Sequence, residues 1–261
     1  HKPDRRQRQM CIRDRIRDDG KFVAETAGNY LITATAGQRS TSIPVVIYDR
    51  GIQREVINVG TGLVQERHTS DFWVFEGVDK RDYAVSGTWG ADGTTYFWDV
   101  TDPAQIRKID SIQVDARTVN DVKVSEDGRI SVISREGASS RRNGIVIIDT
   151  TNPYDVNIIS EYTTNLTGGV HNVFIYQDHV FALSNGERFY VINIEDPKNP
   201  YEVGMFEIGE KGQAIHDVWI EDGIAYSSNW KHGVYIIDVG NGVAGGSPSN
   251  PVVMSNYSYE S

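Results

Sequence analysis

The sequence predicts an all-β protein in which four copies of a four-stranded unit follow a short β segment. Two anchors repeat in step along the chain. A polar residue at the start of an apolar strand recurs at intervals of 50, 51 and 45 residues, at Asp71, Asp121, Asn172 and Asp217. The last residue of a later apolar strand recurs at intervals of 50, 44 and 45 residues, at Asp99, Asp149, Asn193 and Asp238. A period of about 40–50 residues is typical of propellers and solenoids. No segment has a sustained helical apolar period, which favours propeller blades over a helical solenoid.

The N-terminal segment, residues 1–17, differs from the rest of the chain. It holds seven of the 26 Lys and Arg residues, lacks aromatic residues and follows no apolar period. The stretch "MCIRDR" at residues 10–15 resembles the translation of a transposase adaptor used in sequencing libraries. We therefore expect residues 1–17 to be non-native and leave them out of the fold prediction. The single cysteine, Cys11, lies there, so we expect no disulfide and no thiol chemistry elsewhere.

Residues 18–50 predict two strands joined by a turn. The run "NYLITATA" from Asn29 alternates along a strand, and "SIPVVIY" from Ser42 follows after a segment that contains Gly37. The "G-x-Y-x-I-T-A-T" pattern resembles the last strands of a bacterial immunoglobulin-like domain. The resemblance implies that residues 18–50 are the C-terminal remnant of such a domain.

Each repeat unit reads as four short strands. In the fourth unit these are "HDVWIE", "IAYSSN", "GVYIIDV" and "PVVMSNY". Asp222-Gly223 lies between the first two runs, and Asp127-Gly128 occupies the same place in the second unit. Asp-Gly between alternating runs indicates a hairpin. A proline marks the turn before each fourth strand, at Pro103, Pro153, Pro197 and Pro251. We expect four blades, at about residues 68–117, 118–168, 169–213 and 214–261.

Residues 54–67, "REVINVGTGLVQER", precede the first unit as a further outermost strand without a blade of its own. In a closed propeller such a strand completes the last blade. We therefore expect residues 54–261 to be a partial, open propeller of about four blades, truncated at both ends. The exposed strand edges of such an arc favour association.

The repeats resemble those of a known family. The runs "GVYIIDV" and "GIVIIDT", the Asp-Pro and Asn-Pro turns that follow the strands, and the "HDV" and "HNV" pairs are similar to bacterial LVIVD-repeat proteins. The resemblance covers about residues 54–261. It implies a β-propeller that is secreted or displayed on the cell surface, often beside immunoglobulin-like or anchoring segments. It implies no particular activity, because the family has no well-defined common one and propellers host many functions.

Composition and missing motifs exclude several function classes. Beyond residue 17 the chain carries 19 Lys and Arg against 34 Asp and Glu, a net charge of −15, compared with −10 for the whole. Because phosphate contacts need Lys and Arg, we expect no nucleic-acid partner. No apolar run approaches about 18 residues, so we expect no transmembrane segment. There is no Gly-rich phosphate loop before a helix, no G-x-S-x-G, no H-E-x-x-H, no C-x-x-C and no EF-hand loop.

Polar pairs at the starts of the four innermost strands are the first candidate site. They are His68 with Asp71, Asn120 with Asp121, His171 with Asn172, and His216 with Asp217. In a propeller these positions gather at one mouth of the central channel. Imidazole and carboxylate bind Zn, Cu, Fe or Mn, which makes His68, His171 and His216 candidate ligands of a divalent metal. Histidine also titrates near neutral pH and could serve acid–base chemistry.

The same pairs have a structural interpretation. The Asp or Asn would accept hydrogen bonds from backbone N–H groups, and the His would bond a carbonyl of a neighbouring blade. Repeated residues are expected to do a repeated structural task, and Asn120 replaces histidine in the second unit. Both interpretations stand at this point.

Loops between the second and third strands point to the same mouth and differ between blades. Diversity on a regular scaffold is where binding specificity concentrates. We expect these loops to bring Trp89, Arg135, Glu136, Trp230 and His232 to a ligand pocket, the alternative being ordinary surface loops with aromatic packing between blades.

The sequence therefore favours a secreted or cell-surface binding scaffold that presents one propeller face to a protein, a glycan or a small ligand. The alternative is a metal-dependent enzyme with a His, Asp and Asn ring at the channel mouth. A purely structural module of an adhesin is the third class. No catalytic residue is assigned.

Overall fold

The computed structural model describes residues 15–16, 21–24, 26–37, 39–49, 51, 55–209 and 214–258. The chain forms two compact units, residues 1–57 and 58–261. Within the described ranges the one helix is a three-residue 3-10 helix, Trp230–His232, and all other regular structure is strand. No helix in this part of the chain is long and apolar enough to cross a membrane. The predicted all-β class is confirmed.

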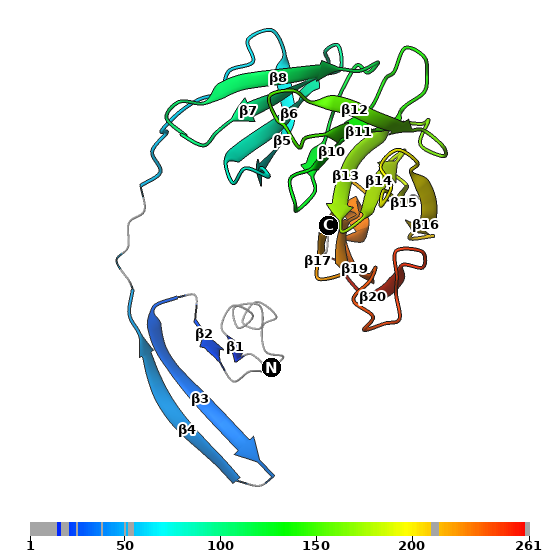
Figure 1. The fold of residues 1–261 in the computed structure, drawn as a ribbon. Helices are drawn as coiled ribbons and strands as arrows, with labels where there is room; N and C mark the ends of the chain where they lie inside the picture. The colour runs from blue at the N-terminus through cyan, green and yellow to red at the C-terminus, as the bar shows by residue number, and fades with distance from the viewer. Residues whose placement is uncertain are drawn as a thin grey trace. The chain divides into compact units, whose positions relative to one another are not determined.

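The first unit contains a long antiparallel hairpin. Strands β3 (Gly28–Ala36) and β4 (Arg39–Ile47) pair along their full length, from Gly28 opposite Ile47 to Ala36 opposite Arg39 (Figure 1). The two strands expected in this region are therefore present. Short strands β1 (Arg15–Ile16) and β2 (Phe22–Val23) pair with each other. Apart from β1, the segment of residues 1–17 that we expect to be non-native, with Cys11, lies outside the described residues.

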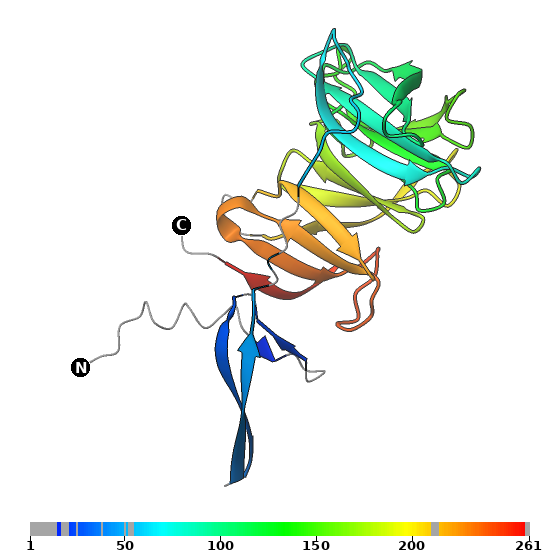
Figure 2. The same cartoon turned by 90° about the vertical axis from the view of Figure 1, so that its left-hand side faces the viewer.

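The second unit consists of four four-stranded antiparallel sheets that follow one another along the chain (Figures 1 and 2). In each sheet the strands stand in chain order, from the innermost first strand to the outermost fourth. Each innermost strand contacts that of the following blade: β5 contacts β9, β9 contacts β13, and β13 contacts β17. The four sheets match the four expected blades, and the partial propeller is confirmed.

The bounds of the strands are β5 (His68–Glu76), β6 (Asp82–Trp89), β7 (Thr94–Asp99) and β8 (Arg107–Gln113) in blade 1; β9 (Val122–Val124), β10 (Ile130–Arg135), β11 (Gly144–Asp149) and β12 (Asn157–Tyr162) in blade 2; β13 (Val170–Tyr176), β14 (His179–Ser184), β15 (Arg188–Asn193) and β16 (Tyr201–Glu207) in blade 3; and β17 (Asp217–Glu221), β18 (Ile224–Ser228), β19 (Val234–Asp238) and β20 (Val252–Tyr257) in blade 4.

Three apolar cores lie between successive blades. One joins blades 1 and 2, one blades 2 and 3, and one blades 3 and 4. Strand β11 shows how the sequence produces this arrangement. Ile145 and Ile147 pack toward blade 3, whereas Val146 and Ile148 pack toward blade 1, and none of the four is exposed. Because successive side chains of a strand point to opposite faces, a continuous apolar run is what a strand buried on both faces requires.

The Asp222-Gly223 turn joins β17 and β18 as expected. Both residues have positive φ, 50° and 73°. This is the geometry of a type I′ hairpin, which Asp-Gly adopts readily because glycine carries no Cβ and aspartate tolerates the left-handed region.

The Asp or Asn that ends each third strand makes the same hydrogen bond in every blade. Its side-chain oxygen accepts a hydrogen bond from the backbone N–H two residues later, at 2.9–3.1 Å. The four residues are Asp99, Asp149, Asn193 and Asp238. The second sequence anchor is therefore a turn that closes on its own backbone.

Asp238 accepts more backbone hydrogen bonds than its equivalents do. Its carboxylate accepts from the backbone N–H groups of Gly240, Gly242, Ala244 and Gly246, at 2.7–3.1 Å. Burial by itself raises the pKa of Asp238, but these N–H donors outweigh it and hold the pKa at about 2. The loop of residues 239–250 is thus folded around one carboxylate.

We expect Asp238→Ala to open this loop to a broad-specificity protease, whereas Asp149→Ala, which removes a single turn bond, leaves it protected. In the wild type, the stabilisation by Asp238 is present above its ordinary pKa of 3.8 and is lost as pH falls through about 2. Cleavage between residues 239 and 250, followed by mass spectrometry, measures both effects. Equal protection of the two variants would contradict this role.

The additional strand expected at residues 54–67 is not formed, since described residues 55–64 belong to no sheet. A strand needs a hydrogen-bonded neighbour, and none is present beside it in the described chain. Residues 58–64, which belong to the second unit, nevertheless run along blade 1. A Cβ on Gly60 would lie 1.8 Å from the carbonyl oxygen of Pro103, and one on Gly62 would lie 3.2 Å from the Trp98 ring.

Between successive blades, the outermost strand of one blade makes a similar close contact with the turn before the fourth strand of the next. Asp110 accepts from Val156 N, Ser160 donates to Pro197 O at 2.6 Å, and a Cβ on Gly204 would lie 2.4 Å from Pro248 O. The contacting residues Gly60, Asp110, Ser160 and Gly204 follow one another at intervals of 50, 50 and 44 residues. Residues 58–64 therefore take the place on blade 1 that an outermost strand takes on the following blade.

Candidate functional site

Two ends of the second unit carry polar side chains from several blades. At the starting end the innermost strands β5, β9, β13 and β17 begin. At the hairpin end these strands turn into β6, β10, β14 and β18. The sequence prediction concerned the starting end alone.

Part of the predicted ring comes together at the starting end. His171 Nδ1 lies 2.9 Å from Glu136 Oε1, and this hydrogen bond with Glu136 raises the pKa of His171. Asn120 Nδ2 donates to the backbone oxygen of His171 at 3.0 Å and to Asn172 Oδ1 at 3.2 Å. Blades 2 and 3 are therefore tied together through the polar pairs.

A row of rings continues from His171 into blade 4. The centroids of His171 and His216 are 5.2 Å apart, and those of His216 and Trp230 are 5.0 Å apart. Trp230 is 60% exposed. These three rings, with Arg117, Glu136 and Asn185, line an open cavity of about 530 Å³, which we call the ring cavity.

His68 and Trp89 lie elsewhere on blade 1. Their ring centroids are 6.3 Å apart, and they line a separate cavity of about 620 Å³ beside the Arg67–Asp92 ion pair. Within the described residues, no group of three or more His, Cys, Asp or Glu side chains is arranged to hold a metal ion. The structure therefore does not bring His68, His171 and His216 together.

Three other predicted residues lie outside both cavities. Arg135 is buried, with 3% of its side chain exposed, and donates to Glu161 of β12 at 2.9 Å, so its register on β10 takes it away from the pocket expected there. His232 is half-buried in the 3-10 helix. Asp217 is exposed and accepts from the backbone N–H of Val218 at 2.8 Å.

The remaining predicted residues, Asp71 and Asp121, hold a lysine between them. Lys123 Nζ donates to Asp121 Oδ1 and, at 3.1 Å, to Asp71 Oδ2. Asp121 is 2% exposed and also accepts from the backbone N–H groups of Val122 and of Val173 in the next blade. We call these three side chains the lysine cluster.

The pKa values of the two carboxyl groups in the lysine cluster shift in opposite directions. Burial, followed by the neighbouring Asp71, raises the pKa of Asp121 to about 8. Burial alone would also raise the pKa of Asp71, but its hydrogen bonds and the charge of Lys123 lower it. The cluster therefore favours a single carboxylate charge, at Asp71, over two.

Lys123 occupies a position that is aromatic in the other blades. Trp73, Phe174 and Trp219 stand two residues after the same anchor, as Lys123 does. The ring centroids of Phe174 and Trp219 are 5.0 Å apart, those of Trp73 and Trp219 are 5.9 Å apart, and Lys123 Nζ lies 5.0 Å from the Trp73 ring centre. A single lysine in a repeated aromatic position was the sequence signal for this cluster.

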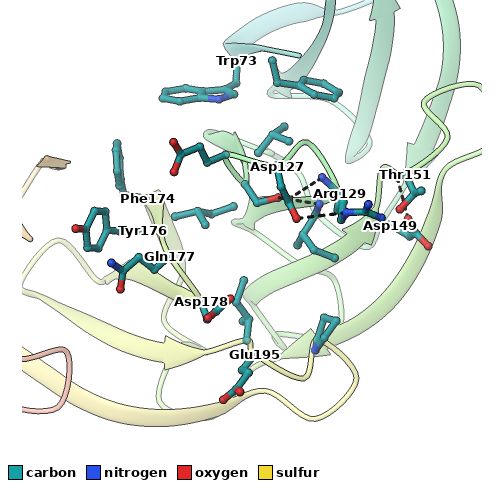
Figure 3. A pocket seen from close by; sticks show the side chains of 18 of the residues that line it. Trp73, Asp127, Arg129, Asp149, Thr151, Phe174, Tyr176, Gln177, Asp178 and Glu195 are labelled. Carbon is teal, nitrogen blue, oxygen red and sulfur yellow. Dashed lines mark hydrogen bonds and ion pairs between the residues drawn. The ribbon is translucent and has the colours of Figure 1, made fainter. Parts of the chain in front are cut away.

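The hairpin end holds a cavity of about 920 Å³, which we call the hairpin groove. Its apolar wall includes Trp73, Phe174 and Tyr176, and it extends between blades 2 and 3 to Ile159 and Pro197. Figure 3 shows Trp73, Phe174 and Tyr176 on one side of the open space, with Asp178 and Glu195 across from Trp73.

The groove is strongly acidic. Seven carboxylates and two cations, Arg129 and Lys198, line it, a net charge of −5. The carboxylates are Glu76, Glu126, Asp127, Asp149, Asp178, Glu195 and Glu221. Glu76 pairs with Lys80, and Asp127 pairs with Arg129 (Figure 3). The other five have no ion pair with any described residue.

Sequence reasoning missed this groove, although a signal was present. An acidic residue recurs at the first hairpin of every blade, in "FEG", "SEDG", "YQDH" and "IEDG". These hairpins were used only as turn signals, because the sequence does not show that Asp149 and Glu195, from other turns, join them.

Comparisons with known proteins bear on the fold. No protein-family model matches the chain, and no curated protein matches it. Among solved structures, the chain is similar to one described as a hypothetical selenium-binding protein from Sulfolobus tokodaii, with 13% identity and a TM-score of 0.53. The match covers 71% of this chain and 53% of that protein, so the chain spans about half of its length. At this identity the likeness supports the propeller fold alone.

Proposed function

We propose that this chain is a binding module of a secreted or cell-surface β-propeller protein, and that it binds a cationic peptide segment in the hairpin groove. The observation that carries the proposal is an aromatic-walled groove with a net charge of −5. The LVIVD-like repeats support the cell-surface setting, as does the resemblance of residues 18–50 to an immunoglobulin-like domain.

The groove has the size and lining of a binding site. Ligand sites are typically about 300–1,000 Å³, with mostly apolar walls and a few placed polar groups. The groove is about 920 Å³, and Trp73 and Tyr176 contribute half-buried rings to it. The faces of such rings attract cations, and the rings also pack against apolar side chains.

The charge favours a cation over other partners. Five carboxylates from three blades, without ion pairs in the described residues, repel one another and are relieved by a positive ligand. A peptide with several Lys or Arg residues matches both the extended groove and the spread of charge. Anionic partners, nucleic acid included, are repelled.

An oligolysine peptide with a fluorescent label tests the proposal at low ionic strength. We expect Asp178→Asn/Glu195→Gln to weaken its binding about threefold to tenfold, because each exposed charge pair contributes about 0.2–1 kcal/mol. Both carboxylates are exposed and make no ion pair with a described residue. Fluorescence anisotropy gives the dissociation constants.

Glu66→Gln/Asp155→Asn is the matched control. It removes the same two charges from exposed positions outside the groove. We expect it to weaken binding only as far as the smaller net charge of the protein does. Equal weakening in both double variants would show that the peptide senses only the acidic surface, and the groove would lose its role. Failure of the wild type to bind would also reject the proposal.

A further inference from the structure

The ring cavity at the starting end has a composition unlike that of the hairpin groove. Trp230, which is 60% exposed, presents an indole to this cavity and stands at the end of the row formed with His216 and His171. An exposed indole face packs well against an apolar ring face. The rest of the lining is largely polar, with Glu136, Asn185 and Arg117 beside several glycines.

Arg117 supplies a positive charge at this cavity. Its side chain crosses Gly137, where a Cβ would lie 2.9 Å from Arg117 Cβ and 3.1 Å from Nε. Arg117 is exposed and forms no ion pair with any carboxylate in the described part of the chain. In a protein of net charge −10, a guanidinium beside a cavity that has no ion pair among the described residues is placed to meet an anionic group.

Glu136, a carboxylate that lines the same cavity, is engaged by a histidine. Glu136 lies 2.9 Å from His171 Nδ1, and His171 is protonated over a wider pH range because of that contact. Among the described residues, Glu136 thus has one oxygen held by His171 and no ion pair with Arg117. Its remaining oxygen, with the Asn185 amide and the His216 ring, provides hydrogen-bond partners for hydroxyl groups.

We propose that the ring cavity binds an acidic sugar, with the sugar ring against Trp230 and its carboxylate on Arg117. A saccharide combines an apolar ring face with a polar edge, which matches an indole beside a largely polar lining. A flat aromatic acid would fit Trp230 but leave the second oxygen of Glu136 and the Asn185 amide without hydrogen bonds when they lose water. The cavity of about 530 Å³ accommodates a ligand of one or two sugar rings.

Calorimetric titration with glucuronate, glucose and benzoate tests this assignment on the full chain. We expect glucuronate to bind about tenfold more tightly than glucose, since a charge-assisted contact contributes about 1.4 kcal/mol or more. Arg117→Gln should lower the affinity for glucuronate to that for glucose. Trp230→Ala should weaken both sugars and abolish magnetisation transfer from protein to the apolar sugar face in saturation-transfer NMR.

Arg67→Gln is the control, because Arg67 lies at the same end but is paired with Asp92 at 3.1 Å; it should bind glucuronate as the wild type does. If Arg117→Gln fails to fold, Arg117→Lys, which keeps the charge but not the planar fork, should bind with intermediate affinity. Unchanged glucuronate binding in the Arg117 variant, equal affinity for glucose and glucuronate, tighter binding of benzoate, or no binding at millimolar concentration would each overturn the proposal.

Discussion

Lys123→Met is expected to lower the free energy of unfolding by about 2–4 kcal/mol. Removing one partner from a buried ion pair costs about 3–5 kcal/mol, because the remaining charge stays buried without compensation. The cost is smaller here, since Asp71 is 39% exposed and burial raises the pKa of Asp121, which disfavours a second carboxylate charge. Methionine retains the contact with Trp73, so the loss comes from charge. Denaturant unfolding at neutral pH, with the shift in midpoint, measures it.

The role of charge in the lysine cluster can be separated from packing. Lys80→Met removes the same side chain from the exposed Lys80–Glu76 pair and should have little effect. In the Lys123→Met background, Asp121→Asn should recover part of the lost stability, because it removes a carboxyl group that has lost its cation. Strictly additive effects of the two substitutions would contradict an electrostatic coupling between Lys123 and Asp121.

Gly204→Val is expected to destabilise the protein by about 1–3 kcal/mol, the usual cost of overpacking. The first added carbon would already lie 2.4 Å from Pro248 O and 3.0 Å from Ser249 Cα. Both contacts are to backbone, which cannot rotate away, so β16 and the turn before β20 must separate. We expect a lower unfolding midpoint and faster amide hydrogen exchange in blade 4.

Met205→Val is the control for Gly204→Val. It introduces the same side chain at the next residue of β16, which is 39% exposed, and should change stability by less than about 0.5 kcal/mol. If hydrogen exchange in blade 4 were unchanged in Gly204→Val, the blade contact at Gly204 would not hold blade 4 in place.

Much of the fold was predictable because the repeat constrains it. The anchors at Asp121 and Asp149 indicated the period, and the Asp222-Gly223 turn indicated a hairpin. Each is a local signal that acts within a few residues. The prediction of a strand before blade 1 was wrong, because a strand forms only beside a hydrogen-bonded neighbour, which the local sequence does not reveal.

The candidate sites were only partly predictable. His171, His216, Glu136 and Trp230 do line one cavity, as their places in the repeat indicated. Arg117 was overlooked because it precedes the repeat anchor and matches no motif, and Arg135 was misplaced because one step of strand register turns a side chain to the other face.

The sequence by itself determined the number of blades, their order and the residues that close each turn, since these depend on spacing and on interactions between near neighbours. Only the tertiary structure decided which polar groups meet. His68 stands apart from His171, Lys123 joins carboxylates from two blades, and Glu195 joins Asp178 in one groove. These contacts bridge residues far apart in the chain, and their energies depend on burial and on distances of a few ångströms, which the packing of blades sets and a periodic pattern does not encode.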